Sequence, residues 1–226
     1  METAQTRVTR NEDVPPSLRA QLLATEHWSL LASRSTTQNE LLVRIAIFLT
    51  LASASIVSLA LIGQATDFDD RFDVFAIALF SILLLVGTLT LLRVSNGSEE
   101  DLAYVIGMNR LRAAYSELDA GIDRYFVASK HDDDRGISQT YAYFPHGSEF
   151  VQPLASSMMF ILVVDAVVAG TLAGLVGYAA GGSGVVIAVV SGLGGASYFV
   201  AWFWRFARRY RAWQREYKAR FPHPVD

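Results

Sequence analysis

Asp165 is the residue of this sequence whose type and position point most directly to chemistry. It lies about 11 residues into a predicted apolar helix, or about 16 Å along the helix axis. A carboxyl group at that depth in a membrane costs several kcal/mol unless it is protonated or paired. Two interpretations follow. Asp165 handles a proton or a cation, or it is a protonated structural residue that hydrogen-bonds a Ser or Thr of a neighbouring span, such as Ser53, Ser55 or Ser58.

The other residues that bind metals or act in catalysis form no known motif. His131 to Asp134 has metal-ligand residue types, but consecutive positions do not converge on one ion, so we interpret this stretch as a solvated turn or a helix N-cap. His27, His146 and His223 are isolated in the sequence, and there is no cysteine. No zinc-protease, serine-hydrolase or phosphate-loop motif is present. We therefore predict a protein that is not an enzyme and that needs no cofactor or metal.

Long runs without any charged side chain surround these residues. The sequence is 52% hydrophobic and 18% charged, and the charge-free runs cover residues 45–65, 74–92 and 166–204. Runs of roughly 18 or more such residues are long enough to cross about 30 Å of hydrocarbon. We predict an all-α integral membrane protein with two transmembrane helical hairpins. Its four spans cover about residues 45–63, 74–92, 154–178 and 185–204.

Capping and turn signals divide the rest of the chain around these spans. Thr37 and Glu40 match a capping box, which predicts a new helix start before the first span. Asn96-Gly97 is a turn signal, and Ser98 is placed to cap the next helix. The predicted order is a flexible tail (1–16), an amphipathic cytoplasmic helix (17–36), hairpin 1 (37–92), a cytoplasmic helical segment (93–153), hairpin 2 (154–204) and a basic aromatic cytoplasmic helix with a tail (205–226).

The segment between the hairpins carries an apolar stripe at helical spacing, which predicts an amphipathic helix with one covered face. Residues 137–144 beyond it form either a short helix or an extended piece. The stripe consists of Tyr104, Met108, Leu111, Tyr115, Leu118, Ile122 and Phe126.

The distribution of Lys and Arg predicts the orientation of the chain. Seven of them follow the fourth span within residues 205–220, whereas the two short connecting loops, 64–73 and 179–184, contain only Arg71. Positive charge near span ends stays in the cytoplasm. We therefore expect a plasma-membrane protein with both termini in the cytoplasm.

Small residues recur at four-residue spacing in the third and fourth spans. Gly170, Gly174 and Gly177 belong to such patterns in the third span, and Gly192 and Ala196 in the fourth. Small residues let helices approach closely in a bilayer. The patterns indicate packing within a hairpin, and a second small face on the third span is available to another copy of the chain. A homo-oligomer is thus one possible partner state, besides the lipid bilayer itself.

The segment after the fourth span combines basic and aromatic residues. It would bind nucleic acid, lie on the membrane surface, or pack its aromatic stripe on the other cytoplasmic helices. We favour packing, because amphipathic helices on one side of a membrane need one another's apolar faces, and we expect no nucleic-acid partner. The residues concerned are Phe206, Arg208, Arg209, Tyr210, Trp213 and Tyr217.

Two stretches carry a resemblance to known proteins. Glu26 to Leu31, continued through the first span, and Gly107 to Tyr115 resemble a family of uncharacterised bacterial four-span membrane proteins. That resemblance covers most of the chain and implies no activity. The layout of a polar helix, two spans and a long cytosolic helix, from Ser17 to about Phe126, is similar to SLATT-type membrane effector domains. This second resemblance implies pore formation by an oligomer, and no site residues follow from it.

Three functions remain open at this point. The first is a non-enzymatic oligomeric membrane protein of pore or effector type, favoured by the small-residue faces, by Asp165 and by the SLATT-like layout. The second is a membrane scaffold whose cytoplasmic helices bind a protein partner. The third is a small transporter, which ranks last because the spans carry few polar residues other than lone hydroxyl groups.

Overall fold

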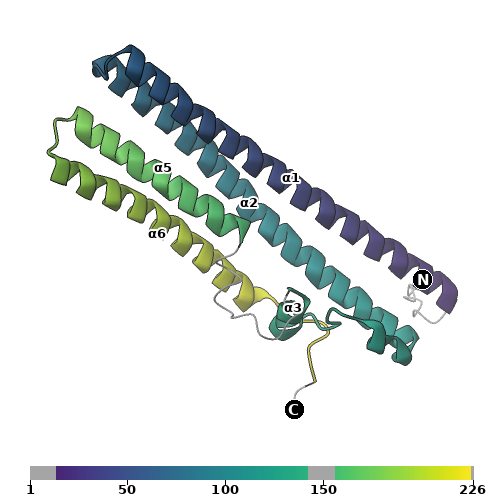
Figure 1. The fold of residues 1–226 in the computed structure, drawn as a ribbon. Helices are drawn as coiled ribbons and strands as arrows, with labels where there is room; N and C mark the ends of the chain where they lie inside the picture. The colour runs from purple at the N-terminus through teal and green to yellow at the C-terminus, as the bar shows by residue number, and fades with distance from the viewer. Residues whose placement is uncertain (1–13, 142–155, 225–226) are drawn as a thin grey trace, which may run out of the picture. The chain divides into compact units, whose positions relative to one another are not determined.

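The structure, a computed structural model, describes residues 14–141 and 156–224. Most of the predicted tail (1–16) and the predicted start of the third span lie outside these residues, as does His146. The described part is all-helical and contains no strand. Its elements are α1 (Pro16–Ala65), α2 (Asp70–Leu118), the 3-10 helix η2 (Ala120–Tyr125), α3 (Asp134–Tyr141), α5 (Ser157–Ala179) and α6 (Gly184–Glu216) (Figure 1).

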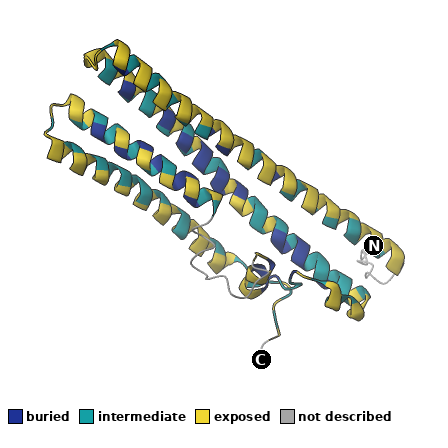
Figure 2. Cartoon of the chain, in the orientation of Figure 1, coloured by how far each residue is buried: buried dark blue, intermediate teal, exposed yellow. Residues whose placement is uncertain are grey.

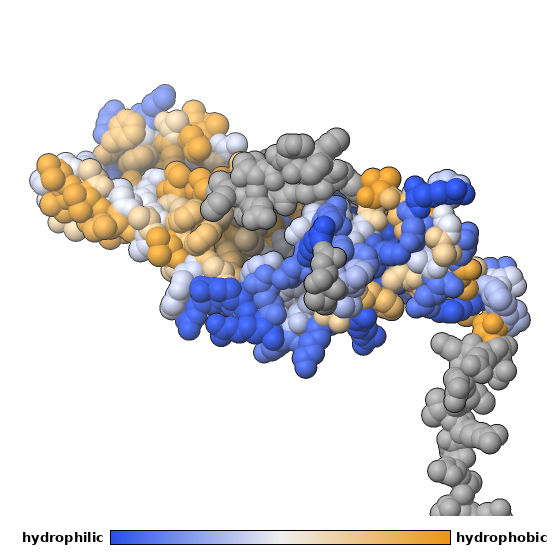
Figure 3. Space-filling view, turned by 90° about the horizontal axis from the view of Figure 1, so that it is seen from below, coloured by the Kyte–Doolittle hydropathy of each residue, from blue (hydrophilic) through white to orange (hydrophobic). Residues whose placement is uncertain are grey.

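Four helices, α1, α2, α5 and α6, are long and apolar enough to span a membrane. Many of their apolar side chains face outward: Leu61 is 63% exposed, Val74 70% and Leu193 65%. The surface accordingly carries broad hydrophobic areas (Figure 3). Apolar patches of this size are rare on soluble monomers, and lipid covers them in a membrane. The chain is therefore a multi-pass membrane protein.

α1 and α2 run without a break through the positions where the sequence predicted helix ends. They contain 50 and 49 residues, which corresponds to about 75 Å each at 1.5 Å per residue. A bilayer core of about 30 Å takes up less than half of that length. The predicted helix start at Thr37 and the predicted turn at Asn96-Gly97 are both wrong.

Contacts between α1 and α2 explain why these signals do not end the helices. The Thr37 hydroxyl donates to Glu100 of α2 at 3.2 Å, and Glu40 binds Arg93 of α2 at 2.9 Å. Gly97 provides space, since a methyl group there would lie 2.5 Å from Leu41 of α1. Polar groups that cap helices in other contexts are thus used here between helices.

The described residues belong to two compact units, each of which includes part of α1 and part of α2. Of the described residues, the bundle unit comprises 36–101 and 156–217, and the clasp unit comprises 14–35, 102–141 and 218–224. The bundle unit has an apolar core. It includes Phe48 of α1, Leu91 of α2, and Ile161 and Leu162 of α5, all fully buried (Figure 2). Phe206 of α6 packs against that core.

The clasp unit is built around the last turns of α2. Val105 and Met108 are buried, and so is Asn109, whose side-chain amide donates to the His131 carbonyl at 2.8 Å. Gly136 packs against the His131 carbonyl so closely that a methyl group would lie 2.2 Å from it. These contacts hold the turn before α3 against α2.

Two predicted helices end earlier in the structure than the sequence suggested. α2 stops at Leu118 and Asp119 caps η2, so Ile122 and Phe126 do not continue the apolar stripe of α2. α6 stops at Glu216 instead of reaching Pro222. The described part of residues 137–144 is helical as far as Tyr141.

Candidate functional site

Asp165 lies in the interior of the bundle unit and is 0% exposed. Its Oδ2 accepts a hydrogen bond from the Tyr198 hydroxyl of α6 at 3.3 Å. The Tyr198 hydroxyl is in turn 2.8 Å from the Thr88 hydroxyl of α2. The second carboxyl oxygen, Oδ1, is buried and has no hydrogen-bond partner among the residues that the structure describes. Three helices thus contribute to one small polar cluster within an apolar core.

Gly87 brings α2 into direct contact with this carboxyl group. A methyl group at Gly87 would lie 1.9 Å from Oδ1 of Asp165 and 2.9 Å from the Phe48 ring of α1. The space that a side chain would occupy on α2 is therefore filled by the carboxyl group. This glycine is needed for close approach of α5 to α2.

The hydroxyl partner of Asp165 is not one of those predicted from the first span. Ser53 and Ser55 donate to carbonyl groups of their own helix, at Leu49 and Leu51. Tyr198 is the one hydrogen-bond partner of Asp165 among the described residues, so Ser58 is not one either. The partner is therefore the phenol hydroxyl of Tyr198 on α6 and not the predicted Ser or Thr hydroxyl group.

The geometry around Asp165 fits a neutral carboxyl group. An ionised carboxylate accepts about four hydrogen bonds, whereas Asp165 accepts one long one. No Lys, Arg or His of the described residues pairs with it. An unpaired charge at this place would cost several kcal/mol, which a proton on the carboxyl group avoids.

α5 and α6 pack on one another through small residues. A methyl group at Gly170 would lie 2.8 Å from the Ser191 carbonyl oxygen, and one at Gly174 would lie 2.2 Å from the Ser191 hydroxyl. Gly177 makes only ordinary contact, at 3.9 Å from Val190. On α6 the close approach is made by Gly195, whose added methyl group would lie 2.8 Å from the Ala166 carbonyl oxygen.

Gly192 and Ala196 do not make this close approach. Nothing lies within 4 Å of a methyl group added at Gly192. Both residues instead line an open groove of about 850 Å³ along α5 and α6, together with Gly170, Gly174 and Phe199. On α5, Gly170 and Gly174 of the predicted small-residue pattern lie at the close contact with α6. On α6, Gly192 and Ala196 lie on a different face of the helix from Gly195, which makes that contact. Asp165 does not line the groove.

The basic aromatic end of α6 makes contacts inside the bundle unit. Arg209 forms an ion pair with Glu99 of α2 at 2.7 Å. The Arg208 guanidinium lies 4.1 Å from the centre of the Trp204 ring. The Trp213 ring lies between those of Tyr210 and Tyr217, at 5.9 and 4.8 Å. Packing of this aromatic stripe on residues 17–36 or 104–126 stays a prediction.

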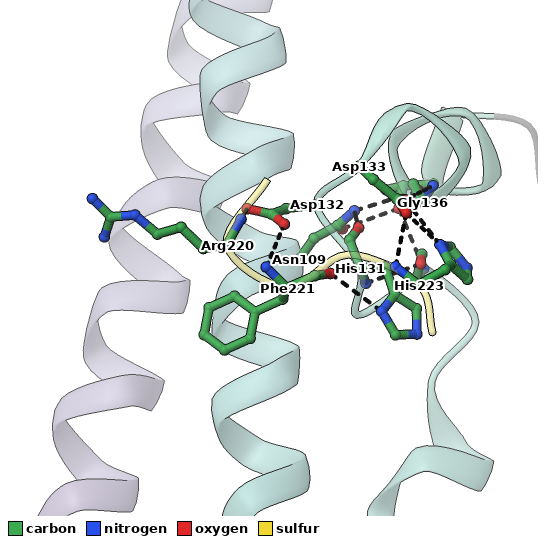
Figure 4. Close-up of polar contacts among 10 residues, drawn as sticks. Asn109, His131, Asp132, Asp133, Gly136, Arg220, Phe221 and His223 are labelled. Carbon is green, nitrogen blue, oxygen red and sulfur yellow. Dashed lines mark hydrogen bonds and ion pairs between the residues drawn. The ribbon is translucent and has the colours of Figure 1, made fainter. Parts of the chain in front are cut away.

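A second buried carboxylate, Asp132, closes the clasp unit and is also 0% exposed. Its Oδ2 accepts from the Arg110 guanidinium at 2.7 Å and from the Arg220 backbone N–H at 3.0 Å. Its Oδ1 accepts from the Phe221 N–H at 2.7 Å, and its own N–H donates to the Phe221 carbonyl at 3.2 Å (Figure 4). These charge-assisted bonds hold the C-terminal segment 218–224, so the predicted solvated turn is wrong at Asp132.

Asp133 continues the same clasp. It caps α3 by accepting from the Gly136 N–H at 2.8 Å, as the N-cap interpretation predicted. It also accepts from the His223 N–H at 2.8 Å and contacts the His223 ring nitrogen Nδ1 at 2.8 Å (Figure 4). Burial raises the pKa of Asp133, but the hydrogen bonds from His223 and Gly136 outweigh it and lower the pKa to about 2.

His223, which is isolated in the sequence, meets His131 in this clasp. The rings of His131 and His223 are 4.0 Å apart, centre to centre. Nδ1 of His131 lies 3.2 Å from the Phe221 carbonyl oxygen, so it carries a proton. No group of three or more His, Asp or Glu side chains within residues 14–141 and 156–224 is placed to hold a metal ion.

Sequence reasoning missed Tyr198 and the clasp for different reasons. A tyrosine in a charge-free run needs a partner for its hydroxyl group, and this signal was available. The contact of His223 with Asp133 joins residues 90 positions apart, and no local pattern marks it. Comparison of the chain with protein-family models, curated proteins and solved structures found no match. The functional argument therefore rests on the geometry of these sites.

Proposed function

We propose that the protein is a non-enzymatic membrane effector that acts as an oligomer and forms a pore. Its four spans form two hairpins in the plasma membrane, and its cytoplasmic helices control the assembly. The layout similarity of residues 17–126 to SLATT-type effector domains supports this proposal. The observation that carries it is the open groove along α5 and α6.

The groove is suited to a helix from a second copy of the chain. It is lined by small residues and by Phe199, and no described residue of the same chain covers Gly192. Lipid chains fill such a groove loosely, whereas a helix fits it with close backbone contacts. A ring of copies joined in this way encloses a path between subunits, while Asp165 stays sealed inside each copy.

The chain offers a matched pair of glycines to test this assembly. Nothing lies within 4 Å of a methyl group added at either Gly192 or Gly184, and only Gly192 lines the groove. Gly192→Leu should therefore leave the single chain folded, reduce the number of copies per particle in lipid nanodiscs, and abolish conductance in liposomes. Gly184→Leu should match the wild type. Wild-type chains that stay single at every protein-to-lipid ratio would refute the oligomer.

The orientation is testable with two reporters. A reporter fused after Asp226 should signal the cytoplasm, and one inserted between Asp67 and Asp70 should signal the outer side, as the basic segment 205–220 indicates. The same signal from both reporters would rule out four spans with cytoplasmic termini.

A membrane scaffold is the second candidate function. It is favoured by apolar residues of α1 that lie outside the apolar span yet remain exposed, namely Trp28 at 71% and Leu22 at 61%. A protein partner would cover such residues. Wild-type liposomes that conduct under no voltage or pH would favour the scaffold over the pore.

A further inference from the structure

Asp165, Tyr198 and Thr88 form a continuous hydroxyl–carboxyl chain inside the bundle unit. The distances are 3.3 Å from Asp165 to Tyr198 and 2.8 Å from Tyr198 to Thr88. The Tyr198 hydroxyl donates to the carboxyl group in the structure. A neutral Asp165 accepts this hydrogen bond through its carbonyl oxygen, and an ionised Asp165 accepts it more strongly because the acceptor is then charged.

The groups packed on the carboxyl offer a negative charge one hydrogen-bond donor, the Tyr198 hydroxyl of α6. Phe48 of α1 and Gly87 of α2 also lie against this part of the bundle, and Thr88 of α2 contacts the Tyr198 hydroxyl. Tyr198 is the only titratable one, and no charged side chain of the described residues pairs with Asp165. The closed arrangement therefore accommodates the protonated carboxyl group and excludes the ionised one.

We propose that Asp165 is a proton-binding site whose occupancy controls the contact between α5 and α2. Oδ1 lies where a side chain at position 87 would be, so an ionised Asp165 reaches water or a cation only if α5 moves away from Gly87. The proton is therefore a ligand of the closed state, in which the Asp165 side chain of α5 contacts Gly87 of α2. Removing it shifts the population toward an open state, because a ligand stabilises the state that binds it more tightly.

This inference does not rest on the proposed pore. Opening between α5 and α2 takes place within one chain, whereas the proposed oligomer uses the other side of α5, along the groove with α6. An inactive pore would leave the proton site intact, and a missing proton site would leave the oligomer intact.

The absence of cysteine allows a direct distance measurement. Leu89→Cys on α2 and Phe160→Cys on α5 replace exposed residues within five positions of Gly87 and Asp165 and carry spin labels. Neither residue lines the groove. Pulsed electron resonance in lipid nanodiscs should show one short distance at acidic pH and a growing, longer distance as the pH rises. Adding Asp165→Asn should leave the short distance at every pH, because Asn keeps the size but has no proton to release. Identical distance distributions with and without Asp165→Asn would overturn the proposal.

A second substitution decides the matter if Asp165→Asn does not fold. Tyr198→Phe removes the only donor to the carboxylate, so the pH at which half of the molecules are open should move upward. Tyr178→Phe, on the exposed surface of α5, is the matched control and should leave that pH unchanged. A midpoint that stays the same in Tyr198→Phe would refute the role of the hydroxyl–carboxyl chain and the proton site with it.

Discussion

Two aspartates of this protein are equally buried but accept different numbers of hydrogen bonds. Asp132 in the clasp unit and Asp165 in the bundle unit are both 0% exposed. Asp132 accepts hydrogen bonds from a guanidinium group and two backbone N–H groups at 2.7–3.0 Å. Asp165 accepts one hydrogen bond at 3.3 Å and leaves one oxygen without a partner.

The comparison teaches that burial alone does not determine the role of a carboxyl group. The number of donors does, because desolvation is compensated only by groups that stabilise the charge. Asp132 has that compensation, and its carboxylate holds the C-terminal segment 218–224 through these hydrogen bonds. Asp165 lacks it, and its surroundings fit a neutral carboxyl group.

The largest expected effect on stability is at Asp132, which holds the C-terminal segment 218–224. Asp132→Ala leaves Arg110 and the N–H groups of Arg220 and Phe221 without their acceptor, and removal of one partner of a buried ion pair costs about 3–5 kcal/mol. The free energy of local opening, measured by hydrogen exchange of the Phe221 amide, should fall by that amount.

Asp134→Ala is the matched control, since Asp134 is an exposed neighbour in the first turn of α3. Exposed substitutions of this kind usually change stability by less than about 0.5 kcal/mol. Equal changes in the free energy of local opening for Asp132→Ala and Asp134→Ala would show that Asp132 does not hold the C-terminal segment.

A medium effect is expected at the contact between Asp165 and α2. Gly87→Ala places a methyl group 1.9 Å from Oδ1, and overpacking of this kind costs about 1–3 kcal/mol. The thermal unfolding midpoint in detergent should fall. Combination with Asp165→Ala should recover much of the loss, because the clashing carboxyl group is gone. Gly184→Ala, where nothing lies within 4 Å and which does not line the groove, should leave the midpoint unchanged. A similar loss there would contradict the assigned contact between Gly87 and Asp165.

The smallest effect is the acid sensitivity of the clasp. The pKa of Asp133 is lowered from 3.8 to about 2, so its contribution to stability is complete above pH 3.8 and is lost as the pH falls toward 2. Pepsin, which works in this range, should cleave near Phe221 faster as the pH falls, once corrected with a free peptide of residues 218–226. Asp133→Asn should flatten this pH dependence. Cleavage that speeds up equally in both proteins would mean that Asp133 does not report on the clasp.

The sequence predicted those features that depend on local composition. The charge-free runs led correctly to four helices able to span a membrane. The depth of Asp165 led to the expectation of a Ser or Thr partner, whereas the structure has Tyr198 in that place. The small residues Gly170 and Gly174 were assigned to close packing, which α5 and α6 confirm. Each of these follows from the cost of polar groups and the benefit of close contact in hydrocarbon.

The remaining features depend on contacts between distant residues. Thr37 and Gly97 carry helix-end signals, but pairing of α1 with α2 uses the hydroxyl group and the missing side chain in another way. Asp132 lies in a stretch that the sequence predicts as a solvated turn, but Arg110 and the backbone of residues 220 and 221, almost 90 positions later, bind its carboxylate. Local propensity is a weak prior that tertiary contacts override.

The most direct test of the contrast between Asp132 and Asp165 is infrared spectroscopy of the carboxyl groups at neutral pH. A protonated carboxyl group absorbs through its C=O stretch, apart from the bands of ionised carboxylates. The wild-type protein in lipid should show a protonated-carboxyl band that Asp165→Asn removes and Asp132→Asn leaves in place. A band that persists in Asp165→Asn, or that is missing from the wild type, would contradict the assignment of a neutral carboxyl group to Asp165.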